Sequence, residues 1–220
     1  MVKKMKLIKN IILIISILAL SFQLYIDFSS IFDLSIKGRV IIVCIQVIGF
    51  ISVYWYYRKK MPIDKREKYF KILVWILFVI YLSNLFYLLF FDQAMGRDFH
   101  MIESIDSQLL YGINFIPLRT IQLYINSYHQ GYLPLSIIAI NLIGNIIAFM
   151  PLAIFLPVLF KSQRKTGIYF ISASLMIVGV EILQVLSASG SGDIDDYILN
   201  IIGSMFMYLI VRLYRKVKKI

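Results

Sequence analysis

Glu181 is the residue of this chain whose type and position most favour chemistry. It lies in a continuous apolar stretch, seven residues before Ala188, so in a helix it would be about 10 Å from the end of that stretch. If the stretch crosses a membrane, an ionised carboxylate there costs about 2.5 to 3.5 kcal/mol unless it is paired or protonated. We therefore expect Glu181 to be protonated or paired with a loop cation such as Arg119 or Arg97, and to be a candidate general acid or base.

Amide side chains occur at a similar depth in neighbouring apolar stretches. Asn141 and Asn145 are one helical turn apart, and Gln184 shares a helix face with Glu181. Each amide taken alone is more typical of an interhelical hydrogen bond, worth about 0.6 to 2 kcal/mol. Together they form a candidate cluster that could orient both a ligand and the helices. Its members are Asn141, Asn145, Gln184 and Asn200, and the nearby Gly144 and Gly203 are predicted to allow close helix packing.

Three acids follow the Gly/Ser-rich turn at 187–192: Asp193, Asp195 and Asp196. One of them, Asp193 or Asp196, could simply cap the next helix, because a carboxylate accepts backbone N–H bonds and suits the helix dipole. Three acids near Glu181 also resemble a site for a hard cation or a cationic substrate, but the spacing of a calcium loop is absent. We expect no metal, and we assign charge recognition to Glu181, Asp193 and Asp196.

Other reaction centres have no signature in the chain. The nucleophile elbow, the phosphate-binding loop, the zinc-protease helix and the dinucleotide fingerprint are all missing. A single cysteine, Cys44, excludes an intramolecular disulfide and a cysteine metal cage. The two histidines, His100 and His129, lie in one polar loop, where an acid/base role stays open. We expect no cofactor.

The composition indicates that a lipid bilayer surrounds these residues. The chain has 220 residues, of which 60% are hydrophobic and only 16% charged, and its mean hydropathy is +0.81. These values exclude an ordinary soluble domain. Six apolar stretches approach the roughly 20 residues that a membrane-spanning helix needs. They run approximately over Leu7–Ile26, Val40–Tyr57, Ile72–Phe91, Leu135–Phe160, Gly167–Ala188 and Tyr197–Val211. The fold class is therefore all-α, a polytopic membrane protein.

The basic residues predict the orientation of the six helices. If the N-terminus is cytoplasmic, 19 of the 23 Lys and Arg lie on the cytoplasmic side and nine of the twelve acids lie outside. Both termini are then cytoplasmic, and Glu181, the amides and the acidic cluster converge in the outer leaflet. The net charge of +11 follows from this asymmetry, so no nucleic-acid partner is expected.

Two segments allow more than one interpretation. The basic start and the sequence Ala19-Leu20-Ser21 are compatible with a cleavable signal peptide, but the apolar stretch continues to Ile26, which favours a retained helix. The loop 92–134 contains many apolar residues, and we expect part of it to pack on the membrane surface as an interfacial helix.

Several short motifs, in this order and on one side of the membrane, resemble the VanZ-like family of bacterial membrane proteins. They are Asn114-Phe115-Ile116-Pro117-Leu118-Arg119-Thr120-Ile121; Asn141-Leu142-Ile143-Gly144-Asn145 with Phe149-Met150-Pro151-Leu152; and Glu181-Ile182-Leu183-Gln184 with Asp193-Ile194-Asp195-Asp196, Asn200 and Gly203. The resemblance makes Asn114 and Arg119 part of the polar cluster. It implies a core at 72–211, a two-helix N-terminal addition at 1–71, a basic tail at 212–220, and a place in the bacterial plasma membrane.

One departure from the family pattern concerns the acidic cluster. Members of the family often carry an Arg a few residues before the acids, where this chain has Ser189-Gly190-Ser191-Gly192. If that Arg pairs with the acids, the geometry here must differ. The resemblance also implies an accessory role in low-level resistance to teicoplanin, a lipid-tailed glycopeptide that its acyl tail places in the outer leaflet.

Three functional hypotheses follow, and the residues leave all of them open. The first is a non-enzymatic or cryptically enzymatic membrane protein acting at the outer leaflet on a lipid-linked envelope molecule or a lipoglycopeptide. The second is an integral-membrane enzyme acting on a lipid-linked substrate, with Glu181 as general acid or base. The third is a small proton-coupled transporter, against which the lack of an internal repeat counts.

Overall fold

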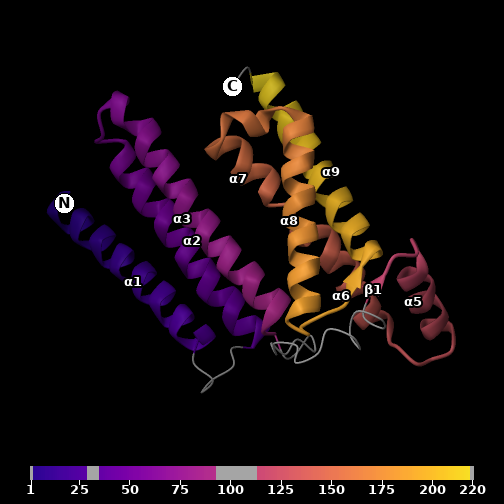
Figure 1. The fold of residues 1–220 in the computed structure, drawn as a ribbon. Coiled ribbons are helices and arrows are strands. Elements are labelled where there is room, and N and C mark those ends of the chain that lie inside the picture. The colour runs from indigo at the N-terminus through magenta and orange to yellow at the C-terminus, as the bar shows by residue number, and fades with distance from the viewer. Residues whose placement is uncertain (1, 29–34, 93–112, 219–220) are drawn as a thin grey trace. The chain divides into compact units, whose positions relative to one another are not determined.

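A computed structural model describes residues 2–28, 35–92 and 113–218. Within these residues, six helical segments are long and apolar enough to cross a membrane: Met5–Asp27, Lys37–Arg58, Ile63–Phe90, Leu135–Leu159, Thr166–Leu186 and Ile194–Lys218. The all-α, multi-pass prediction is thereby confirmed. Figure 1 shows the helices, which form two compact units, 1–83 and 84–220.

The first unit consists of α1 (Val2–Phe28), α2 (Ile36–Arg58) and α3 (Ile63–Phe90) up to Ser83. Its core contains Phe50 of α2 with Leu73 and Ile80 of α3, and partly buried side chains of α1 pack against them. Because Leu73 and Ile80 of α3 belong to this core, most of α3 lies in the first unit, which ends at Ser83. The predicted family core, 72–211, begins within this helix, and that boundary stays a prediction.

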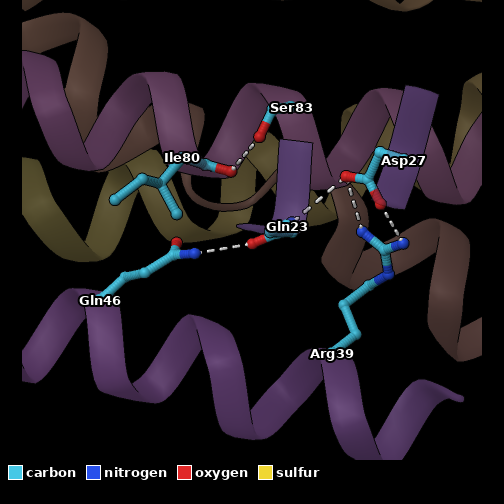
Figure 2. A network of polar contacts seen from close by, with 6 residues as sticks. All are labelled: Gln23, Asp27, Arg39, Gln46, Ile80 and Ser83. Carbon is cyan, nitrogen blue, oxygen red and sulfur yellow. Dashed lines mark hydrogen bonds and ion pairs between the residues drawn. The ribbon is translucent and has the colours of Figure 1, made fainter. Parts of the chain in front are cut away.

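A polar network joins α1 to α2 (Figure 2). Gln46 donates from Nε2 to Oε1 of Gln23 over 2.9 Å, and both side chains are fully buried. Gln23 donates from Nε2 to Oδ2 of Asp27 over 3.5 Å. The Asp27 carboxylate also accepts from Nη2 and Nη1 of Arg39, over 2.6 and 3.2 Å. A bidentate pair satisfies a buried charge better than a single contact does. The network holds α1 beside α2, and the retention of the first helix stays a prediction.

Replacing Gln46 with leucine should lower the free energy of unfolding of the first unit by about 1 kcal/mol, because Gln23 loses its interhelical donor. The apparent Tm in detergent measures the change. Ile48→Leu, at an exposed position of the same helix, is the control and should leave Tm unchanged. A Gln46→Leu protein at least as stable as the wild type would show that the network does not hold α1 to α2.

The second unit contains α5 (Arg119–His129), α6 (Leu135–Ala148), α7 (Leu152–Leu159), the 3-10 turn η2 (Lys161–Arg164), α8 (Thr166–Leu186) and α9 (Ile194–Lys218). The predicted fourth span is divided into α6 and α7. Pro151, which cannot donate a helical hydrogen bond, is the N-cap of α7, whereas Pro157 lies inside it. The interruption therefore occurs at 149–151, and α6 and α7 are separate helices in Figure 1.

The last helix is longer than the sequence predicted. It extends beyond Tyr197–Val211 to Ile194 and Lys218. Asp193 caps its start by accepting the Asp195 N–H over 2.9 Å. Its last turn carries Arg215, Lys216 and Lys218, which suit the negative end of the helix dipole. Buried Tyr169 of α8 stacks on Tyr208 of α9, with ring centroids 4.1 Å apart.

Candidate site at the start of the last helix

A two-residue parallel ladder brings the loop motif to the acidic turn. Strand β1 (Ile113–Asn114) pairs with β2 (Gly192–Asp193), so that Asn114 lies opposite Asp193. Asn114 donates from Nδ2 to Asp193 over 3.0 Å and accepts the Ile116 N–H at 3.1 Å, which turns the chain toward α5. Two segments 79 residues apart are thus fixed side by side.

Asp195 caps a helix that lies far away in the sequence. Helix α5 begins after Leu118, which has a left-handed φ of 67°. The Leu118 side chain is apolar and cannot accept a hydrogen bond from the first turn of the helix. Asp195 instead accepts the backbone N–H of Leu118, Thr120 and Ile121, the last two at 2.8 and 3.3 Å. These are orphan donors at the positive end of the helix dipole. Asp195 is only 1% exposed. The N–H donors and the positive dipole end of α5 compensate its buried carboxylate.

Asp193 connects the same elements. Its two oxygens accept from Asn114, from the Thr120 hydroxyl and from the Asp195 N–H. All these donors are neutral, and Asp193 is 7% exposed. Because both Asp193 and Asp195 use their oxygens in these contacts, their main observable role is to dock β1 and α5 on the start of α9.

The predicted amides do not all join this site. Asn145 donates to Asp196, linking α6 to α9. Asn141 donates to the Ile137 carbonyl of its own helix, and Gln184 donates to the Leu89 carbonyl near the end of α3. The bonds of Asn145 and Gln184 correspond to the helix-joining interpretation of single amides, whereas the Asn141 bond stays within α6.

Buried Asn200 and the two glycines complete the α9 side of this region. Asn200 is 3% exposed, and its Oδ1 has no hydrogen-bond donor among the described residues. A Cβ built on Gly203 would lie 1.8 Å from the carbonyl oxygen of Ile146, so α6 and α9 touch there through backbone. A Cβ on Gly144 would meet no heavy atom of a described residue within 4 Å, so the packing role predicted for Gly144 has no support.

A cavity of about 330 Å³ opens beside the docked loop, between α8, β1, β2 and the start of α9. Its walls are mainly apolar and include Phe115, Val178, Ile182 and Val185. Glu181 also lines it, and its Oε2 accepts the Asp193 N–H over 3.3 Å. The cavity therefore combines hydrocarbon surface with two carboxylates, half-buried Glu181 from α8 and buried Asp193 from β2.

A protein-family model described as VanZ/LLP1 matches residues 78–215, which is more than half of the chain. The chain belongs to the VanZ/LLP1 family. The predicted family resemblance is confirmed, and the match begins within α3. Searches of curated proteins and of solved structures returned no match.

The VanZ/LLP1 match covers every residue of the predicted polar cluster, but the cavity separates them into two groups. Asn114, Glu181 and Asp193 line it. The residues outside the lining are Arg119, Asn141, Asn145, Gln184, Asp196 and Asn200. Within the described part of the chain, no three His, Cys, Asp or Glu side chains are grouped so that they could hold a metal ion.

No ion pair joins Arg119 to a described residue, and its side chain is exposed at the start of α5. The predicted pairing with Glu181 is therefore absent from the structure, whereas Arg97 lies outside the described residues. The resemblance implies an Arg a few residues before the acids, where this chain has Ser189-Gly190-Ser191-Gly192. Amide, hydroxyl and backbone donors hold Asp193 and Asp195.

Two residues that hold β1 and α5 on the start of α9 are absent from the predicted site: Asp195 and Thr120. The sequence predicts Asp195 only as a member of the acidic run and Thr120 only as a member of the loop motif. One sequence signal pointed to them. Pro117 and Leu118 precede α5 without a Ser, Thr, Asp or Asn that could cap it, so an acceptor has to come from elsewhere in the chain.

Proposed function

We propose that this VanZ-family membrane protein binds a lipid-linked envelope molecule or a lipoglycopeptide at the outer leaflet, without chemical turnover. The observation that carries the proposal is the apolar cavity of about 330 Å³ with Glu181 in its wall. Most ligand sites are concave and mainly apolar, with a few polar groups that fix orientation. A hydrocarbon tail would enter between α8 and the docked loop, and the Glu181 carboxyl would bind a polar or cationic group next to the tail.

Helix α5 supports a position at the membrane surface. It has no buried residue, and the apolar side chains of Ile125 and Tyr128, which share one helix face, are exposed. An amphipathic helix with such a face lies in the head-group region of a bilayer. By the positive-inside rule, this end of the bundle is the outer end, which is where the acyl tail of teicoplanin would insert.

A susceptibility measurement tests the proposal. A sensitive Gram-positive host expresses the wild-type chain, Glu181→Gln or Glu67→Gln at equal membrane levels, and its growth inhibition by teicoplanin and by vancomycin is compared. Glu67 is an exposed carboxylate of the first unit, so it is the matched control. We expect the wild type and Glu67→Gln to protect against teicoplanin alone. We expect Glu181→Gln to lose most of that protection, because the apolar wall of the cavity loses the carboxyl group that would bind the polar part of the ligand.

Two results would contradict this proposal. Protection unchanged in Glu181→Gln would remove the carboxylate from the mechanism. Equal protection against vancomycin, which lacks the lipid tail, would remove the role of the cavity.

A proton-coupled transporter predicts that protection disappears when a protonophore collapses the proton gradient, whereas a binding protein keeps its protection.

An integral-membrane enzyme is the second candidate, and the position of Glu181 in the cavity wall favours it specifically. In that case Glu181 would transfer a proton to or from a bound lipid-linked substrate. Binding and turnover separate the two candidates. An enzyme with Glu181→Gln should still retain the lipid but form no product, whereas a binding protein should lose affinity.

A further inference from the structure

A second cavity lies at the opposite end of α8 and α9 from the acidic turn. Its volume is about 130 Å³, and three arginines line it together with three neighbouring residues. The lining residues are Pro157, Arg164, Tyr208, Val211, Arg212 and Arg215. None of them is acidic, so three positive charges share one small space. Figure 1 shows α7 and the C-terminal end of α9 at this end of α8, and β1 and α5 at the other.

We propose that this cavity is a binding site for a phosphate-bearing anion. An arginine guanidinium has five N–H donors in a planar fork that matches phosphate oxygens. Arg164 uses Nε, and Arg215 uses Nη1, to donate to the Pro157 carbonyl over 3.2 and 3.3 Å. Arg212 donates from Nη1 to the Thr166 hydroxyl. One N–H of each guanidinium is engaged in this way, and among the described residues the remaining N–H groups have no acceptor, so they can donate to an anion.

Helix capping accounts for only part of this arrangement. The Pro157 carbonyl belongs to the last turn of α7, where carbonyls lack helical partners and a nearby cation is favourable. A single arginine would satisfy that carbonyl, but two converge on it. Bringing Arg164, Arg212 and Arg215 together opposes folding through charge repulsion, and a bound anion would remove that repulsion.

The backbone around the cavity is held by buried groups. Tyr208 donates its hydroxyl to the Arg164 carbonyl over 2.8 Å, while its ring stacks on Tyr169. The Tyr169 hydroxyl is in turn bonded to buried Ser204, with an oxygen separation of 2.5 Å. A site whose backbone is already fixed loses less entropy when it binds a ligand.

Another basic cavity shows what is unusual here. In the first unit, Arg58 and Arg66 line a cavity of about 310 Å³, but Glu67 lines it too and Arg58 stacks over Trp55. The Glu67 carboxylate there offsets part of the positive charge of the two arginines. The arginine cavity of the second unit lacks such an acid in its lining, which is why we assign the anion to it.

Two sources could supply the phosphate: the head group of an anionic lipid or free phosphate. Arg212 lies 17 residues after Asp195 on α9, about 25 Å along the helix axis. The positive-inside rule places that end at the cytoplasmic leaflet, where anionic lipids attract clustered arginines. The proposal is independent of the outer cavity, because it concerns other residues at the far end of the same helices.

Native mass spectrometry of the full chain in neutral detergent tests the site, with phosphatidylglycerol as the probe and diacylglycerol as the phosphate-free comparison. The variant Arg164→Gln/Arg212→Gln/Arg215→Gln should bind phosphatidylglycerol about tenfold more weakly, because charge-assisted hydrogen bonds are lost. The control Lys161→Gln/Lys165→Gln/Lys216→Gln removes equal charge from residues outside the lining and should bind as the wild type.

Competition with added inorganic phosphate then identifies the source of the bound phosphate group. Displacement of the lipid indicates a free-phosphate site, and no displacement indicates a head-group site.

Three results would overturn the proposal: phosphatidylglycerol affinity unchanged in the arginine variant, equal loss in the lysine control, or equal retention of diacylglycerol. The single variant Arg212→Gln is expected to fold like the wild type, because the Arg212 side chain is exposed and donates a hydrogen bond to the Thr166 hydroxyl only at the protein surface. This single variant should weaken phosphatidylglycerol binding about threefold while the apparent Tm stays unchanged.

Discussion

Gly203→Ala is expected to destabilise the second unit by about 3 kcal/mol or more, because overpacking between two backbones leaves no side chain to move aside. The added methyl would lie 1.8 Å from the Ile146 carbonyl oxygen and 2.7 Å from its carbonyl carbon, where 3.4 Å or more is ordinary contact. Helix α6 must then move away from α9. We expect a large drop in apparent Tm in detergent and a lower yield of folded protein from membranes.

Gly144→Ala is the matched control on α6. The same methyl group there meets no heavy atom of a described residue within 4 Å. Alanine also has the higher helix propensity, so we expect an unchanged or slightly raised Tm. If Gly203→Ala were as stable as Gly144→Ala, the close approach of α6 and α9 in the structure would be wrong.

Asp195→Ala is the second substitution with a large expected effect. It leaves the N–H groups of Leu118, Thr120 and Ile121 without their acceptor and removes the negative charge at the start of α5. A buried donor without a partner costs about 1 to 3 kcal/mol. Relaxation of α5 toward water offsets part of the sum, and we expect a loss on the order of 3 kcal/mol.

Hydrogen exchange by mass spectrometry locates this effect. Peptides covering 113–129 should exchange much faster in Asp195→Ala, whereas peptides of α1 and α2 should not change. Glu67→Gln, which removes an exposed carboxylate paired with Lys71, should leave both regions as in the wild type. Unchanged protection of 118–121 in Asp195→Ala would show that α5 does not depend on this cap.

The sequence by itself determined the membrane class, the six spans and the family. Long apolar stretches have few alternatives in a bilayer, because every backbone N–H and C=O must be bonded within the segment. The same reasoning placed Glu181 in a span, and the capping role of Asp193 was among the predicted alternatives. These features depend on local composition and spacing, which can be read directly from the residues.

Only the tertiary structure decided what the polar residues contact. Asp195 reaches a helix start more than 70 residues away, and Asn114 meets Asp193 across a two-residue ladder, which no local pattern specifies. The close contact at Gly203, the open surroundings of Gly144 and the sharing of one cavity by three arginines depend on how helices cross. Helix crossings and loop docking are set by contacts between residues that are distant in the sequence. For this reason Gly144 and Gly203, which the sequence predicts alike as packing glycines, differ in their surroundings.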